Sequence, residues 1–116
     1  MATIHIIEDD RDLLEILGSQ FTARGFKVIR DFNGEQFAEG HTHNADLYLI
    51  DIALVGRSGL DISRQIKSGQ LQKPVILMSG NFHKHSDIHE AEADAFIQKP
   101  FQLNEMVEQV RAMLPA

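Results

Sequence analysis

The chain has 116 residues and a net charge of -6, with 43% hydrophobic residues, 24% charged residues and no cysteine. These values predict one soluble globular domain covering residues 1–116. No apolar run approaches the roughly 20 residues of a membrane helix, and no secretory signal is visible. The acidic balance argues against direct binding of nucleic acid. The lack of cysteine excludes disulfides and thiolate metal sites, which fits a cytoplasmic location.

Short apolar runs alternate with helix-like segments along the whole chain. Five such strand–helix units predict an α/β fold with a parallel sheet. The predicted strands cover residues 3–7, 26–30, 46–51, 75–78 and 95–98. The predicted helices cover residues 10–24, 34–39 and 59–68, with a last helix whose apolar stripe runs from Leu103 to Leu114.

Two segments lack a clear periodic pattern. Residues 53–58 predict a loop that carries Gly56. Residues 82–93 hold few apolar side chains, and short helices depend on packing an apolar face. We therefore predict that a fourth helix begins late, near Ser86, and is the least protected element of the fold.

Acidic residues follow two of the apolar runs. Glu8, Asp9 and Asp10 come after the first run, and Asp51 ends the run Leu47–Ile50. Parallel strands bring their carboxyl ends to one crevice, so these carboxylates would repel one another unless a cation lay between them. Mg2+ prefers such hard oxygen ligands. Asp10 is also suited to capping the helix that follows, which leaves Glu8, Asp9 and Asp51 as the candidate magnesium ligands.

Ser79 and Lys99 end two further apolar runs and complete a set of polar groups at the same edge. A lysine supplies a positive charge to a phosphoryl oxygen, and a serine can donate a hydrogen bond to another. Each residue also has a simpler interpretation. Ser79 precedes Gly80 and fits a turn, and Lys99 fits an ion pair with one of the acids, which could hold the site before phosphorylation.

The complete pattern resembles the receiver domain of two-component response regulators. The similarity covers the whole chain and rests on five segments in the correct order. They are Ile4–Asp10, Asp46–Asp51, Gly56 with Gly59-Leu60, Pro74–Gly80 and Phe96–Phe101. The resemblance implies a single flavodoxin-like (βα)5 domain, with a five-stranded parallel sheet in the order 2-1-3-4-5 and helices on both faces.

The resemblance also implies a role for individual residues. Asp51 is expected to accept a phosphoryl group from a sensor histidine kinase or a histidine phosphotransfer protein. Asp9, Asp51 and the Ala53 main-chain carbonyl are expected to bind Mg2+, for which Mn2+ can substitute, with Glu8 acting through water. Ser79 and Lys99 are expected to contact the phosphoryl group, and the Lys99-Pro100 peptide to be cis. Ser79 and Phe96 are expected to switch the face made by the fourth helix, fifth strand and fifth helix.

Two other classes share part of this pattern. A haloacid-dehalogenase-type phosphatase also uses an aspartate at a strand end, but it needs a second acid two residues later, where this chain has Ala53. A pseudo-receiver that binds a partner without phosphorylation would normally lack one of the acids or the lysine, and this chain keeps them all. The sequence therefore favours a phosphoacceptor switch that dephosphorylates itself slowly, and not a turnover enzyme.

Overall fold

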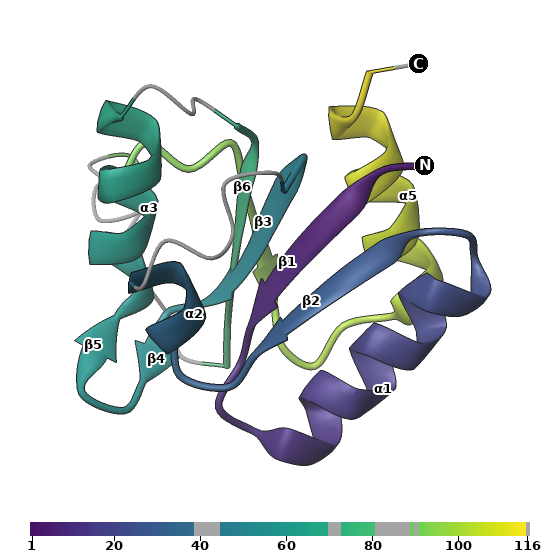
Figure 1. The fold of residues 1–116 in the computed structure, drawn as a ribbon, viewed down its shortest axis with the longest axis horizontal. Coiled ribbons are helices and arrows are strands. Elements are labelled where there is room, and N and C mark those ends of the chain that lie inside the picture. Colours follow the sequence, from purple (N-terminus) through teal and green to yellow (C-terminus); the bar gives the residue numbers. More distant parts are fainter. Residues whose placement is uncertain (39–44, 70–72, 81–88, 90, 116) are drawn as a thin grey trace.

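The computed structural model describes residues 1–38, 45–69, 73–80, 89 and 91–115. A five-stranded parallel sheet has the order β2-β1-β3-β6-β7 (Figure 1), which confirms the predicted topology. Its strands are β1 (Thr3–Ile7), β2 (Lys27–Asp31), β3 (Leu47–Asp51), β6 (Val75–Ser79) and β7 (Ala95–Gln98). The described helices are α1 (Arg11–Ala23), α2 (Glu35–Ala38), α3 (Gly59–Ser68) and α5 (Leu103–Met113).

Two apolar layers cover the two faces of the sheet. On one face α1 and α5 pack through Leu17, Phe21 and Val110 against even-numbered residues of β1 such as Ile4. On the other face α2 and α3 pack against Ile7 and further residues of the central strands. Burial on both faces explains why β1, β3 and β6 are almost continuously apolar in the sequence. Among the described residues, no helix combines the length and apolar character needed to cross a membrane.

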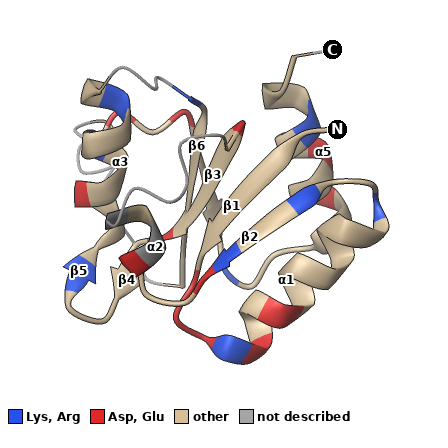
Figure 2. Ribbon diagram, in the orientation of Figure 1, with Lys and Arg blue, Asp and Glu red and all other residues tan. Residues whose placement is uncertain are grey.

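Strand β1 lies between β2 and the central strand β3. From β1 the chain first moves outward to β2 and then returns to the other side of β1 to form β3. The two connections therefore run in opposite directions along the sheet, and the carboxyl ends of β1 and β3 form the switch point at which sheets of this kind bind ligands. This is the edge at which the sequence places its acidic residues, and Figure 2 shows acidic residues at the turn from β1 into α1.

Each predicted boundary at a described end either agrees with the observed one or differs from it by one residue. Helix α1 is shorter than residues 10–24 because Asp10 is its N-cap and Arg24 its C-cap. The connection predicted as a loop at 53–58 instead contains a small antiparallel hairpin, in which β4 (Ala53–Leu54) pairs with β5 (Arg57–Ser58). The predicted fourth helix and the end of the helix at 34–39 lie largely outside the described residues.

Candidate functional site

Three carboxylates meet at the carboxyl ends of β1 and β3. Glu8 and Asp9 follow β1 directly, and Asp51 is the last residue of β3. The two strands pair in register, with Ile7 opposite Ile50, so the acids reach the same height. One oxygen from each of the three carboxylates lies within 4.8 Å of the others. The predicted convergence of these acids is therefore confirmed.

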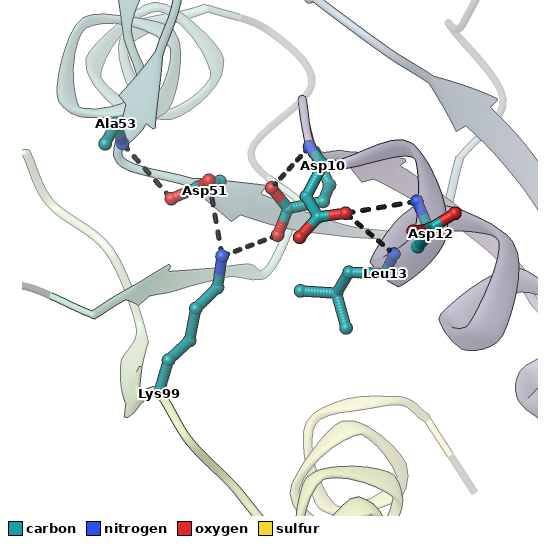
Figure 3. A network of polar contacts seen from close by, with 7 residues as sticks. Asp10, Asp12, Leu13, Asp51, Ala53 and Lys99 are labelled. Atoms are coloured by element: carbon teal, nitrogen blue, oxygen red, sulfur yellow. Dashed lines mark hydrogen bonds and ion pairs between the residues drawn. The ribbon is translucent and has the colours of Figure 1, made fainter.

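Lys99 reaches this cluster from the far edge of the sheet, where it follows β7. Its Nζ lies 2.7 Å from Glu8 Oε1 and 3.3 Å from Asp51 Oδ2 (Figure 3). The backbone places it there, because β7 pairs with β6 and the Lys99 amide then donates to the Ser79 carbonyl at 2.9 Å. The peptide between Lys99 and Pro100 is cis, as predicted. The predicted ion pair of Lys99 is also confirmed, and it involves two acids.

Burial in the protein makes the negative charge of this cluster energetically costly. Glu8 is fully buried and Asp51 is 4% exposed, whereas Asp9 is half-buried. Burial, reinforced by the neighbouring Asp51 carboxylate, raises the pKa of Glu8 from 4.5 to about 7. Burial alone would lower the pKa of Lys99, but the hydrogen bond and charge of Glu8 raise it above its ordinary value. One ammonium group therefore does not balance the negative charge of the cluster at neutral pH.

Backbone amides fix the two deepest carboxylates. The Asp10 amide donates to Glu8 Oε2 at 3.2 Å, and the Ala53 amide donates to Asp51 Oδ1 at 3.1 Å (Figure 3). The Asp10 side chain turns away from the cluster and caps α1 by accepting from the amides of Asp12 and Leu13, which confirms its predicted capping role. The role of the Ala53 carbonyl as a metal ligand stays a prediction.

Gly59 holds the loop against the cluster, a role that sequence reasoning did not assign to it. Its amide donates to the Ile52 carbonyl at 2.9 Å, and a Cβ at this position would collide with the Asp51 main-chain carbonyl. The glycine thus lets the start of α3 lie directly against the end of β3. The only signal in the sequence was a glycine that opens a helix, which by itself does not indicate such a close approach.

Ser79 and Phe96 lie on neighbouring strands beside the cluster. Ser79 ends β6 and is fully buried, and Phe96 on β7 is half-buried. Phe96 pairs with Leu77, two residues before Ser79, so parity places both side chains on the same face of the sheet. Phe96, Phe101 and Met106 line an open groove of about 360 Å³ between β7 and α5. The predicted contact of Ser79 with a phosphoryl group and the switching of Phe96 stay predictions.

The chemistry of the donors fits a divalent cation of the magnesium type. Glu8, Asp9 and Asp51 offer only oxygen ligands, and Mg2+ prefers these over nitrogen or sulfur. The raised pKa of Glu8 indicates negative charge that Lys99 alone does not compensate, and a cation near these oxygens would relieve it.

A family model described as the response regulator receiver domain matches residues 4–111. The chain belongs to this family. The response regulator SaeR from Staphylococcus aureus is 26% identical over 116 residues, which cover 98% of this chain and 51% of SaeR. The chain thus spans about half the length of this relative. Membership makes it a phosphoaccepting domain of two-component signalling, and not a classical enzyme.

Solved structures of the receiver family share the fold across nearly the entire chain. The response regulator TrrA from Thermotoga maritima, solved in complex with Mg2+-BeF, has a TM-score of 0.87 at 28% identity, covering 98% of this chain and 100% of that one. The chemotaxis protein CheY4 from Vibrio cholerae has a TM-score of 0.89 at 13% identity, covering 98% and 99% of the two chains, and this likeness shows the fold alone.

Proposed function

We propose that residues 1–116 form one receiver unit in which Asp51 accepts the phosphoryl group. One observation carries this assignment. Asp51 ends the central strand β3 at the crevice, within reach of two other carboxylates and of the Lys99 ammonium. Like Glu8, it contacts Lys99 and accepts a hydrogen bond from a backbone amide, here that of Ala53. A carboxylate in these surroundings is a positioned nucleophile with a cation beside it.

The proposed donor is a phosphohistidine on a sensor histidine kinase or a histidine phosphotransfer protein. An Asp51 carboxylate oxygen attacks phosphorus in line and forms the new O–P bond. The P–N bond breaks, and the imidazole leaves with the electron pair. The product is an acyl phosphate on Asp51. Later attack of water on phosphorus releases inorganic phosphate and restores the carboxylate.

The surrounding residues stabilise charge during this transfer. Asp9, Asp51 and the Ala53 carbonyl are the proposed ligands of Mg2+, which Mn2+ can replace, and Glu8 acts through water. A bound divalent cation supplies charge neutralisation at the phosphoryl oxygens. Lys99 already lies 3.3 Å from Asp51, so its ammonium can pair with an oxygen of the phosphoryl group after transfer. The TrrA complex with Mg2+-BeF supports a site of this kind in a relative that is 28% identical.

We further propose that Ser79 and Phe96 relay phosphorylation to the face formed by β7 and α5. The Ser79 hydroxyl would move toward the phosphoryl group, and the Phe96 ring would turn into the space that it leaves. The groove lined by Phe96 borders that face, so a ring movement would change its shape. A partner that prefers one of the two shapes would then shift the equilibrium between them. We also propose a cytoplasmic location, which a chain without cysteine fits.

Phosphorylation with a small donor tests the acceptor directly. With acetyl phosphate and Mg2+, intact-mass spectrometry is expected to show one added phosphoryl group in the wild type and none in Asp51→Asn. Asp9→Asn should lose Mg2+ affinity and phosphorylation together. Asp10→Asn is the matched control, because it removes a neighbouring charge while asparagine still caps α1. Labelling that survives in Asp51→Asn would refute the assignment.

A further inference from the structure

A histidine and an aspartate form a buried pair inside the sheet, away from the acidic cluster. His5 lies in the middle of β1, and Asp31 is the last residue of β2. His5 Nε2 lies 2.9 Å from Asp31 Oδ2, and the two residues are 0% and 1% exposed. Polar groups this deep are costly unless they are paired, so the pair needs a structural or functional reason.

Asp31 connects three parts of the chain through its side-chain carboxylate and its main-chain carbonyl. Its carboxylate accepts from His5, from the Gly34 amide at 2.8 Å and from the Phe37 amide at 3.0 Å, which ties β1 to the turn and helix after β2. Its main-chain carbonyl accepts from the Glu8 amide at 3.1 Å. Asp31 is therefore the residue through which the β2–α2 connection holds the backbone of Glu8.

The His5 ring is packed so that it cannot turn toward another hydrogen-bond partner. Its centroid lies 5.3 Å from that of Tyr48 and 6.4 Å from that of Phe37, both of which pack around it. Within the described part of the chain, the buried Nδ1 atom has no hydrogen-bond partner. Nε2 faces a carboxylate and so carries the proton. The ring therefore makes its hydrogen bond to Asp31.

The charge state of Asp31 agrees with this arrangement. Burial alone would raise its pKa, but the hydrogen bonds from His5 and the Phe37 amide lower the pKa below its usual range. The carboxylate therefore stays ionised and keeps its acceptor capacity for the amides of the turn.

We propose that Asp31, held by His5, is a positioning residue for the acidic cluster. By fixing where β1 ends against β2, it sets the backbone of Glu8, and through Glu8 it sets the position of the carboxylate that meets Lys99. The inference rests on the proposed function, because it treats the cluster as the magnesium site. It differs from a role that is only structural, in which the pair would stabilise α2 without affecting the cluster.

The test compares two substitutions of His5. Leucine fills similar space but removes the donor to Asp31, whereas glutamine keeps an amide N–H that can reach it. We expect His5→Leu to raise the Kd for Mg2+ about tenfold, at the low end of the range typical of outer-shell changes, and His5→Gln to stay within about twofold of the wild type. The probe is Mg2+ alone. It is titrated into each protein at a temperature below the unfolding transition, and binding is followed by the backbone amide NMR shifts.

A second readout does not depend on metal. In the metal-free protein, the Glu8 amide of His5→Leu should exchange with solvent about tenfold faster than in the wild type, because its acceptor is less firmly held. Val110→Ala is the matched control. It destabilises the opposite face of the sheet, where Val110 is fully buried on α5, and should leave both readouts unchanged.

A double variant, His5→Val with Asp31→Ala, guards against loss of folding. Removing both partners leaves neither of these polar side chains unpaired in the core, although the Gly34 and Phe37 amides lose their acceptor. The proposal expects this variant to fold and still to bind Mg2+ about tenfold more weakly. Wild-type affinity in it, together with unchanged exchange at Glu8 in His5→Leu, would overturn the positioning role. A wild type that does not bind Mg2+ would instead refute the proposed function, and the exchange of the Glu8 amide would then decide the positioning role by itself.

Discussion

Replacing Glu8 with glutamine should stabilise the metal-free protein above neutral pH. The unfolded chain releases the Glu8 proton near pH 4.5, whereas the folded protein holds it to about 7. A pKa raised by folding favours the folded state below the lower value, and the advantage disappears as the pH rises through the higher one. Glutamine keeps the neutral form at every pH. The variant should therefore match the wild type near pH 4.5 and exceed it above pH 7.

The size of the effect follows from the same pKa values. At about 1.4 kcal/mol for each pKa unit, the rise from 4.5 to about 7 sets an upper limit of about 3–4 kcal/mol. Because part of this rise comes from the hydrogen bond and charge of the neighbouring Asp51 carboxylate, we assign only part of it to Glu8 alone and expect about 2 kcal/mol at pH 8. With a denaturation slope of about 1.5 kcal/mol per molar urea, this moves the unfolding midpoint by about 1.3 M.

Urea unfolding in EDTA, followed by circular dichroism at pH 5 and pH 8, measures this difference. Glu108→Gln on α5 is the control, since its side chain is 75% exposed and its loss should change stability little at either pH. Saturating Mg2+ should stabilise the wild type more than Glu8→Gln and so narrow the gap at pH 8. If the two proteins have the same pH profile, Glu8 is not the strained acid of this cluster.

Three further results are expected. Gly59→Ala should lower the unfolding free energy by about 2–3 kcal/mol in chemical denaturation and slow phosphorylation, because its Cβ displaces the Asp51 carbonyl; wild-type rates would show that the loop accommodates it. Ser79→Ala should still accept phosphate but show smaller NMR shifts around Phe96, and equal shifts would reject the relay. Lys99→Met should lower stability by about 3 kcal/mol at pH 8, because it leaves buried acids unpaired, and the loss should shrink at pH 5.

Much of the sheet was predictable because its strands are buried on both faces. β1, β3 and β6 are apolar runs that no helix pattern explains, and the acids at the ends of β1 and β3 mark the site. The hairpin of β4 and β5 was missed because two residues per strand carry no periodic signal. Its turn depends on Gly56, whose φ of 78° suits few other residues.

The residues proposed to hold the site in place, His5 and Asp31, were harder to predict than the site residues themselves. The proposed ligands are acids at strand ends, which local sequence reveals, but Asp31 ends an ordinary edge strand and resembles a turn residue. His5 was the available signal, since a histidine inside a buried strand needs a partner. Its partner is 26 residues away on the neighbouring strand, and pairing across a sheet is not visible in one sequence.

The link between Lys99 and the acids ties the site to the completion of folding. Glu8 and Lys99 are separated by 91 positions in the chain, and Asp51 and Lys99 by 48. A chain emerging from the ribosome holds all three acids long before β7 exists to deliver the cation. Contacts of such long range form only when the distant segments have come together. The three acids therefore gain the Lys99 ammonium only after β7 has paired with β6, and a partly folded chain holds these acids without it.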